Sequence, residues 1–322
     1  MMSLALLFPG QASQEVGMGK DVYDASPAAR AVFDAADDAL APTLGTKIST
    51  LCFEGPEDEL RRTEIQQPAI LTTSVALLRA LEEAVGPLGA AFVGGHSLGE
   101  YSALVAAGAL DFEDAVRTVN LRGRLMQEAV ADGKGAMAAV MGLAPESVAE
   151  ACAAAAEASG LVVTPANYNS PQQTVIAGET AGVEAACEKA KELGAKKTVG
   201  LPVSAPFHCA LMEPAAQKLA PELGRLVFQE ANPPVITNVE ASPNADASRI
   251  PGLLEEQVTA PVRFSDMIAT MKTEGVDAFL EVGPGRVLSG LIARIERRAR
   301  RANFSSLAEL DEVREFLQGT AS

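Results

Sequence analysis

Several side chains that often carry chemistry are rare in this sequence. Among its 322 residues there are no tryptophans, three tyrosines and two histidines, His96 and His208. A reaction that uses an imidazole as its base must therefore use one of these two residues. Four cysteines lack the short spacings of metal ligands, so we expect free thiols in a reducing compartment and no metal site. They are Cys52, Cys152, Cys187 and Cys209.

Long hydrophobic runs and positive charge are also scarce. No apolar stretch approaches the roughly 20 residues that cross a bilayer, and the apolar segment 4–8 lacks the basic flank of a secretion signal. We therefore expect a soluble, cytoplasmic protein that does not bind a membrane. The 26 basic residues are outnumbered by 42 acidic ones, giving a net charge of −16, which argues against nucleic acid as a partner. An acidic partner would need a local basic patch.

The stretch from Gly94 to Glu100, which reads GGHSLGE, is the strongest chemical signal in the chain. It places the pattern G-x-S-x-G around Ser97, between an apolar run at 89–93 and a helix-forming run at 101–107. Such a strand-turn-helix corner is typical of a nucleophile elbow, because the two glycines leave room for a sharp turn. The serine hydroxyl then lies at a helix N-terminus, which stabilises a developing oxyanion. Ser97 is therefore predicted to be a nucleophile.

Alternating apolar strands and helical patterns predict an α/β protein. The first strand, 4–8, ends in a Pro-Gly turn, and a long helix is predicted from about Pro68 to Val85. Between residues 132 and 198 the order strand-helix-strand-strand-helix-strand predicts a ferredoxin-like unit. We expect this small subdomain to interrupt a larger catalytic domain made of residues 1–131 and 199–322.

The two histidines differ in their fitness as a base for Ser97. His96 adjoins the serine, and neighbouring side chains point away from each other, so a structural role is predicted for it. His208 stands at a loop-to-helix junction and is the predicted base. No acidic residue between Ser97 and His208 stands out as a third member, which favours a pair oriented by a neutral acceptor. Cys209, beside His208, is a rival nucleophile.

Six separated motifs resemble those of the malonyl-CoA:acyl carrier protein transacylases of bacterial type II fatty acid synthesis. In order they are GQASQ (10–14), GHSLGEYSA (95–103), RG (122–123), ANYNSP (166–171), HCALM (208–212) and EVGPG (281–285). The resemblance implies an α/β-hydrolase-like large domain with the ferredoxin-like insert. It also implies ping-pong transfer of a malonyl group from malonyl-CoA, through an ester on Ser97, to the phosphopantetheine thiol of an acidic acyl carrier protein, with no tightly bound cofactor.

The resemblance assigns roles to further residues. His208 acts as the base, and the backbone N–H groups of Gln11 and Leu98 form the oxyanion hole. Arg122 pairs with the malonyl carboxylate, so acetyl-CoA, which leaves the guanidinium unpaired, is disfavoured. The main-chain carbonyl of Gln257 orients His208 in place of an acid.

Two positions bear on selectivity and on loop geometry. Phe207 resembles the large ring that narrows the pocket of malonyl-selective members against the α-methyl group of methylmalonyl-CoA, and Leu98 agrees with that subset. Ala12 replaces a glycine that is usual in the first loop of the family. A positive φ at this position would strain an alanine, and we expect Ala12 to adopt an ordinary conformation.

Two basic clusters are candidates for docking the acidic carrier: Arg294 and Arg298 belong to the denser one, and Lys196 and Lys197 form the other. A charge run is also commonly a solvated surface, and that alternative stays open. Two other functions stay open as well. A serine hydrolase, such as a thioesterase or a lipase-like enzyme, would use the same elbow with an acid and without the Arg122 clamp. A carrier-docking module would have no catalytic activity.

Overall fold

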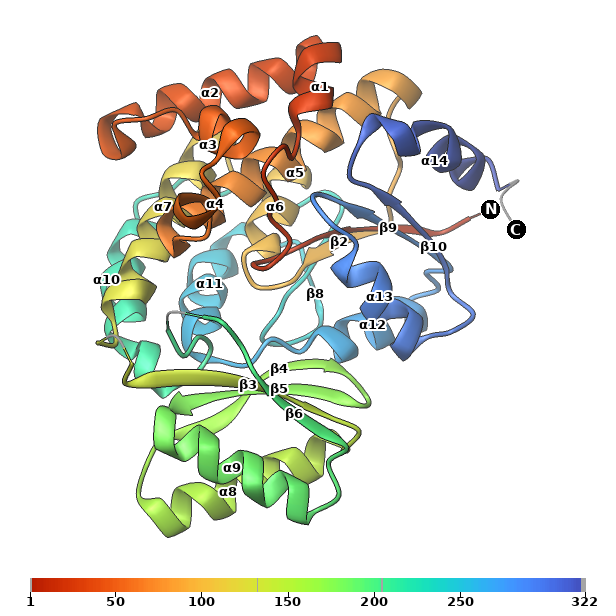
Figure 1. The fold of residues 1–322 in the computed structure, drawn as a ribbon. Helices are drawn as coiled ribbons and strands as arrows, with labels where there is room; N and C mark the ends of the chain where they lie inside the picture. Colours follow the sequence, from red (N-terminus) through yellow and green to blue (C-terminus); the bar gives the residue numbers. More distant parts are fainter. Residues whose placement is uncertain (1, 132, 204, 320–322) are drawn as a thin grey trace.

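Continuous apolar runs form the centre of the larger of two sheets in the computed structural model, which describes residues 2–131, 133–203 and 205–319 (Figure 1). Strand β1 (Leu4–Phe8) is buried at every position and pairs in parallel with β2 (Phe92–Gly95) and β9 (Ala278–Val282). Strands that are covered on both faces read as such runs. The order is β10-β9-β1-β2-β7-β8, and only β8 is antiparallel to its neighbour. The remaining strands are β7 (Val235–Ile236), β8 (Pro243–Asn244) and β10 (Arg300–Phe304).

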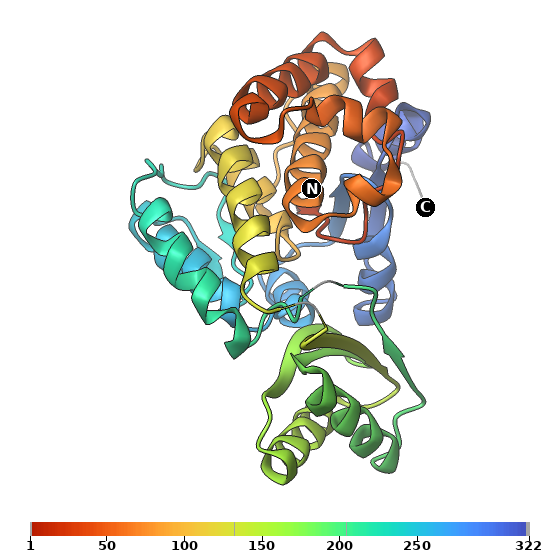
Figure 2. The same ribbon diagram turned by 60° about the vertical axis from the view of Figure 1, so that its left-hand side comes forward.

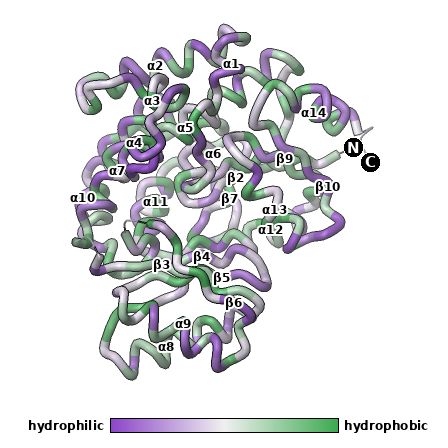
Figure 3. The backbone as a smooth tube through the Cα atoms, viewed as in Figure 1, coloured by the Kyte–Doolittle hydropathy of each residue, from purple (hydrophilic) through white to green (hydrophobic). Residues whose placement is uncertain are grey.

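Helices cover both faces of this sheet because alternate residues of β1 point to opposite sides. Leu4, Leu6 and Phe8 pack into the core beneath α2, α5, α6 and α7, whereas Ala5 and Leu7 pack against α12 and α13. Hydrophilic and hydrophobic stretches alternate along outer helices such as α2 (Figure 3), as expected for helices with one buried face. The helices of this part are α1 (Lys20–Ala25), α2 (Pro27–Leu44), α3 (Ile48–Glu54), α4 (Glu57–Leu60), α5 (Thr63–Val85), α6 (Gly99–Ala106), α7 (Phe112–Glu128), α10 (Glu213–Leu223), α11 (Ile250–Thr259), α12 (Phe264–Thr273), α13 (Val287–Ile295) and α14 (Leu310–Leu317), with short 3-10 turns η1 (Ala210–Met212), η2 (Ala247–Arg249) and η3 (Leu307–Glu309).

The smaller sheet stands at one end of the molecule (Figure 2). Its four strands are antiparallel to their neighbours in the order β4-β5-β3-β6, and α8 and α9 pack on it. This is the strand order of a ferredoxin-like βαββαβ unit. The predicted fold class, a large α/β domain that carries a small antiparallel subdomain, is confirmed. The elements are β3 (Gly135–Met141), α8 (Pro145–Ser159), β4 (Val163–Ser170), β5 (Gln173–Glu179), α9 (Thr180–Glu192) and β6 (Lys197–Gly200).

Helix α5 begins at Thr63, five residues before the predicted start at Pro68. A proline inside a helix has no N–H for the carbonyl four residues earlier. Asn120 of α7 donates its side-chain N–H to that carbonyl, the one of Glu64, at 2.8 Å. Helix α7 approaches closely enough that a Cβ on Gly123 would collide with the backbone of α5. The early turns of α5 are thereby brought beside α7, where both helices contribute to the site.

Candidate active site

Ser97 lies at the sharp turn between β2 and α6 with a φ of 52°. A Cβ on Gly95 would collide with the backbone of Gly99, and one on Gly99 would collide with the carbonyl of Phe8. Only glycine fits at both positions, because β1, β2 and α6 meet there without room for a side chain. The predicted nucleophile elbow is thus present, with the serine at the N-terminus of α6.

Asn238, from a distant part of the chain, stabilises this turn with two hydrogen bonds. Its Oδ1 accepts a hydrogen bond from the backbone N–H of Ser97 at 2.6 Å, and its Nδ2 donates to the carbonyl of Gly95 at 2.7 Å. The sequence analysis missed this residue. A signal existed, because Asn238 follows the buried strand β7, whose carboxyl end adjoins that of β2.

His208 faces the serine, as predicted. Its Nε2 lies 2.7 Å from Ser97 Oγ, and its Nδ1 lies 2.8 Å from the main-chain carbonyl of Gln257. A carbonyl only accepts, so Nδ1 carries the proton and Nε2 is left as the acceptor for the serine hydroxyl. Burial, followed by the positive charge of Arg122, lowers the pKa of His208 to about 3. The imidazole is therefore neutral and has the tautomer that a general base requires.

Arg122 extends from α7 into the same site and is 0% exposed. Its Nη2 donates to Ser97 Oγ at 3.1 Å and to Gln257 Oε1 at 3.0 Å, and its Nη1 donates to Gln67 Oε1 at 2.7 Å. Its Nε has no hydrogen-bond partner among the described residues. All of these acceptors are neutral, so among the described residues no carboxylate occupies the donors of the guanidinium beside the serine hydroxyl. Such a group favours a substrate that brings a carboxylate.

Gln11 and Leu98 lie on either side of the serine turn. Leu98 directly precedes the first helical residue of α6. The loop of Gln11 packs on the elbow, because a Cβ on Gly10 would collide with the carbonyl of His96, and the side chain of Gln11 donates to Gln66 Oε1 at 2.7 Å. The Gln11 loop therefore lies against the elbow, and Leu98 follows Ser97 directly in the chain.

Ala12 does not adopt the ordinary conformation that we expected. Its φ is 73°, in the left-handed region that glycine adopts without cost. The expectation was wrong because the backbone path, and not the side chain, decides the conformation here: the loop turns between β1 and the elbow. Ser13 steadies this turn by donating its hydroxyl to the carbonyl of Gly10 at 2.8 Å.

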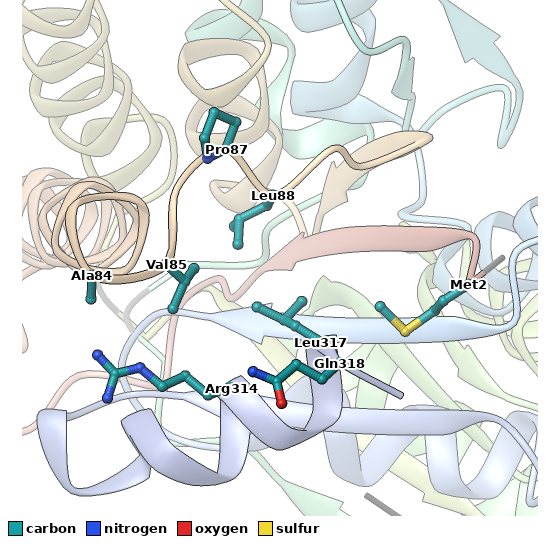
Figure 4. A pocket seen from close by; sticks show the side chains of 8 residues that line it. All are labelled: Met2, Ala84, Val85, Pro87, Leu88, Arg314, Leu317 and Gln318. Atoms are coloured by element: carbon teal, nitrogen blue, oxygen red, sulfur yellow. The ribbon is translucent and has the colours of Figure 1, made fainter. Parts of the chain in front are cut away.

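A cleft of about 390 Å³ leads toward this site. It is lined by Gln11, Ala12, Gln14, Arg61, Thr63, Gln66, Leu201, Pro202, Val203 and Phe207. A second hollow of similar volume lies away from the serine, between the end of α5 and α14 (Figure 4). Its one charged residue, Arg314, pairs with Asp311 on the outer surface. The first cleft is therefore the candidate entrance for a substrate.

The remaining candidates have structural partners. His96 is partly buried, its Nε2 lies 2.8 Å from Asn169 Oδ1 of β4, and its ring packs on Phe264. Cys209 is buried, donates its thiol to the carbonyl of Pro206, and burial raises its pKa to about 11. A thiol with this pKa is a poor nucleophile near neutral pH, and it is Ser97, not Cys209, whose side chain contacts the His208 base.

Arg294 of one basic cluster lies near Lys196 and Lys197 of the other, at one end of the small sheet. Lys197 of β6 pairs with Met141 of β3, which in turn pairs with Gln173 of β5. Arg294 of α13 donates to Gln173 Oε1 at 2.7 Å. Lys196, Lys197, Arg294 and Arg298 are all exposed. Clusters about 100 residues apart in the chain thus lie within a few strand spacings of each other.

The described ranges also offer no site of two other kinds, a metal centre and a membrane span. No group of three or more potential ligands among histidine, cysteine, aspartate and glutamate is placed to hold a metal ion there. No helix in those ranges is both long and apolar enough to span a bilayer.

Known proteins are similar to this chain in sequence and in fold. The model of the acyl transferase domain family matches residues 5–308. The malonyl CoA-acyl carrier protein transacylase of Bacillus subtilis is 50% identical over 299 residues, which are 92% of each chain. A solved acyl carrier protein S-malonyltransferase of Vibrio cholerae has a TM-score of 0.92 at 44% identity, covering 97% of this chain and 99% of that one. A solved malonyl-transacylase in complex with its type II PKS acyl-carrier protein has the same TM-score of 0.92 and identity of 44%, covering 98% and 99%. This chain belongs to the malonyl CoA-acyl carrier protein transacylase family.

Proposed function

We propose that this protein transfers a malonyl group from malonyl-CoA to the phosphopantetheine thiol of an acyl carrier protein, through a malonyl ester on Ser97. One observation carries the proposal: Ser97 Oγ contacts His208 Nε2 at 2.7 Å and Arg122 Nη2 at 3.1 Å. A base and a carboxylate-binding group therefore meet at one nucleophile, which suits an acyl group that ends in a carboxylate.

In the first half of the reaction His208 takes the proton of Ser97 while Oγ attacks the thioester carbonyl of malonyl-CoA. A bond forms between Oγ and the carbonyl carbon, and the negative charge moves to the carbonyl oxygen. When this tetrahedral intermediate collapses, the C–S bond breaks and the imidazolium gives its proton to the CoA thiolate. The carbonyl of Gln257 accepts from Nδ1 throughout and keeps Nε2 facing the reaction.

The oxyanion and the malonyl carboxylate on Ser97 are stabilised by different groups. The N–H groups of Gln11 and Leu98 receive the oxyanion, and each donor contributes on the order of 3 kcal/mol to the transition state. Arg122 receives the malonyl carboxylate, while its hydrogen bonds to the amide oxygens of Gln67 and Gln257 hold the guanidinium in place. An acetyl group leaves this buried charge unpaired, which disfavours it.

In the second half the carrier's thiol takes the place of CoA. His208 removes the thiol proton, the sulfur attacks the ester carbon, and the proton returns to Ser97 Oγ as the ester bond breaks. No tightly bound cofactor enters these steps, because the chain's own side chains move every proton. We place this reaction in the cytoplasm, and we assign the phosphopantetheine to the partner protein.

Docking and selectivity complete the proposal. Arg294, Arg298, Lys196 and Lys197 form a basic surface suited to an acidic carrier in a protein whose net charge is −16. Phe207, a buried residue that lines the cleft, narrows it against an α-methyl substituent on the acyl group. The division into residues 1–131 with 199–322, and an inserted 132–198, is supported by the two separate sheets.

The deciding experiment follows the label from substrate to carrier. The protein is incubated with malonyl-CoA labelled in the malonyl group, label on Ser97 is located by peptide mapping, and holo carrier protein is then added. We expect labelled Ser97 and quantitative transfer to the carrier thiol, with Ser97→Ala taking up no label. Release of label to water in preference to the carrier would favour the serine hydrolase, and an unlabelled protein would favour a docking module.

A further inference from the structure

Glu100 is a buried carboxylate that the proposed steps do not use. It lies in the first turn of α6, three residues after Ser97, and is 2% exposed. Its Oε2 accepts two hydrogen bonds, from the backbone N–H of Asn238 at 3.0 Å and from Nε2 of Gln257 at 2.8 Å. Burying a carboxylate costs several kcal/mol unless its contacts compensate. The cost of burying a carboxylate so close to the nucleophile therefore indicates that Glu100 has a function.

The contacts of Glu100 determine which way the amide of Gln257 points. The Nε2 of Gln257 meets three acceptors: Glu100 Oε2 at 2.8 Å, the carbonyl of Ser97 at 3.0 Å and Asn238 Oδ1 at 3.4 Å. A carboxylate and a carbonyl only accept, so the amide must present its NH₂ group to them. Its oxygen, Oε1, is then the atom that faces Arg122 Nη2 at 3.0 Å.

The opposite orientation would disrupt the site. With the amide turned over, its NH₂ group would face the guanidinium, two donors would oppose each other, and Arg122 would lose one of its three neutral acceptors. Glu100 would at the same time face an amide oxygen instead of a donor. Of the three acceptors on Nε2, Glu100 Oε2 makes the shortest bond, and because it also accepts from the backbone N–H of Asn238, it is an acceptor in either protonation state of the carboxyl group.

We propose that Glu100 is a positioning residue for carboxylate selectivity, which acts through the side-chain amide of Gln257 to hold Arg122 aimed at the acyl group on Ser97. This inference rests on the proposed function, because it concerns how the malonyl carboxylate is recognised.

The amide between the two charges serves a purpose that a direct ion pair would not. A carboxylate in contact with Arg122 would occupy the donors that the substrate's carboxylate needs. Here Oε2 of Glu100 accepts a hydrogen bond from the amide of Gln257, and the polarised amide oxygen steadies the guanidinium by hydrogen-bond cooperativity. Arg122 is held in place while its charge stays available.

The test compares malonyl-CoA with acetyl-CoA in variants of Glu100. Glu100→Leu removes the acceptor, and we expect the malonyl-to-acetyl ratio of kcat/KM to fall by at least about tenfold, as for the loss of a hydrogen bond to a charged group. Glu100→Gln can offer one oxygen to both donors, because both bonds use the same carboxylate atom. We expect it to keep the ratio within about threefold of the wild type.

Two further comparisons separate positioning from general damage. Glu281 is a matched control, since it is equally buried and accepts hydrogen bonds from the backbone N–H groups of Leu288 and Ser289. We expect Glu281→Leu to keep the malonyl-to-acetyl ratio. In a double-mutant cycle with Gln257→Leu, which retains the main-chain carbonyl, we expect the second substitution to add almost nothing to the first, because both remove the same contact to Arg122.

Each result supports or overturns the inference. A folded Glu100→Leu protein with an unchanged ratio overturns it, and so does an additive cycle or an equal loss in Glu281→Leu. Folding is checked by thermal unfolding, and if the leucine variant does not fold, the smaller Glu100→Ala is judged by the same criteria. A wild-type protein that fails to transfer malonyl at all would refute the proposed function instead, so the two failures are distinguishable.

Discussion

Ser97 and His208 meet at 2.7 Å from two left-handed backbone conformations, with φ of 52° and 61°. Each such residue costs about 1–2 kcal/mol relative to an ordinary conformation. Both are held by groups from elsewhere in the chain, Ser97 through its backbone N–H by Asn238 and His208 through its ring by the Gln257 carbonyl. Both residues whose side chains must meet thus carry backbone strain, and the Asn238 side chain and the Gln257 main-chain carbonyl hold them there.

The low pKa of His208 leads to a prediction about pH. Its pKa is lowered to about 3, so the imidazole stays in its neutral, base-competent form far below the pH at which a free histidine becomes protonated. We expect kcat/KM for malonyl-CoA to stay nearly flat between about pH 7.5 and 5, where an ordinary imidazole would lose most of its neutral form. Burial raises the pKa of Glu100 to about 7, so this residue would titrate within the same pH range. The measurement therefore uses Glu100→Gln, which removes that titration. A decline centred near pH 6.5 would show that His208 has an ordinary pKa.

Arg122 is the second cause of this low pKa, and it is also the predicted selectivity residue. Arg122→Ala should lower kcat/KM for malonyl-CoA by on the order of 10²–10³-fold, the cost of removing one partner of a buried charge pair. Acetyl-CoA should lose far less, because it never pairs with the guanidinium. Arg117→Ala on the same helix is the control, since Arg117 is exposed and pairs with Glu113. An unchanged malonyl-to-acetyl ratio in Arg122→Ala would remove Arg122 from substrate recognition.

Local sequence patterns account for the parts of the site that could be predicted. The elbow is a contiguous motif in which Gly95 is required by a collision with the backbone of Gly99 four positions later, and the scarcity of histidine left His208 as the base. The sheet order of the small subdomain followed from its sequence of elements. Arg122, Gln257 and the oxyanion loop were placed by family resemblance and not by spacing.

Other contacts leave no local pattern in the sequence. Asn238 holds the N–H of a residue 141 positions away, and Gln67 holds Arg122 from 55 positions away. Gln67 was also missed because Pro68 is typical of a helix start, which placed Gln67 outside the predicted helix. In the structure the helix begins earlier, and Asn120 satisfies the carbonyl that the proline leaves free. The φ of Ala12 could not be predicted, since it depends on how the loop passes between strand and elbow.

Phe207 gives a prediction about the acyl group. Phe207→Ala removes a buried ring from the cleft that leads to the serine. We expect the preference for malonyl-CoA over methylmalonyl-CoA to fall by roughly ten- to a hundredfold, which is the usual worth of excluding one methyl group from a pocket. The comparison uses kcat/KM for both thioesters with the same carrier. A preference that does not change would mean that another side chain excludes the methyl group.

Ala12 gives a prediction about stability. Glycine adopts a φ of 73° without strain, which favours the folded state by about 1–2 kcal/mol, but its freedom in the unfolded chain costs roughly 0.5–1 kcal/mol. We therefore expect Ala12→Gly to raise the free energy of unfolding by about 0.5–1 kcal/mol. Denaturant titration of both proteins at one pH measures the difference. A loss of stability would show that the loop relieves the strain in another way.

The basic surface formed by Arg294, Arg298, Lys196 and Lys197 gives a prediction about the carrier. Reversing charge with Arg294→Glu and Arg298→Glu should raise the KM for the carrier by about tenfold at low salt, because electrostatic attraction mainly speeds encounter. Labelling of Ser97 by malonyl-CoA should not change, since that step precedes docking. Added salt should raise the carrier KM of the wild type toward that of the variant, because exposed charges are screened beyond about 8 Å at physiological ionic strength. The control is Arg225→Glu at the end of α10, a highly exposed residue outside the surface. If Arg225→Glu raises the carrier KM as much as the double variant does, the effect comes from net charge alone, and the basic surface has no special role in docking.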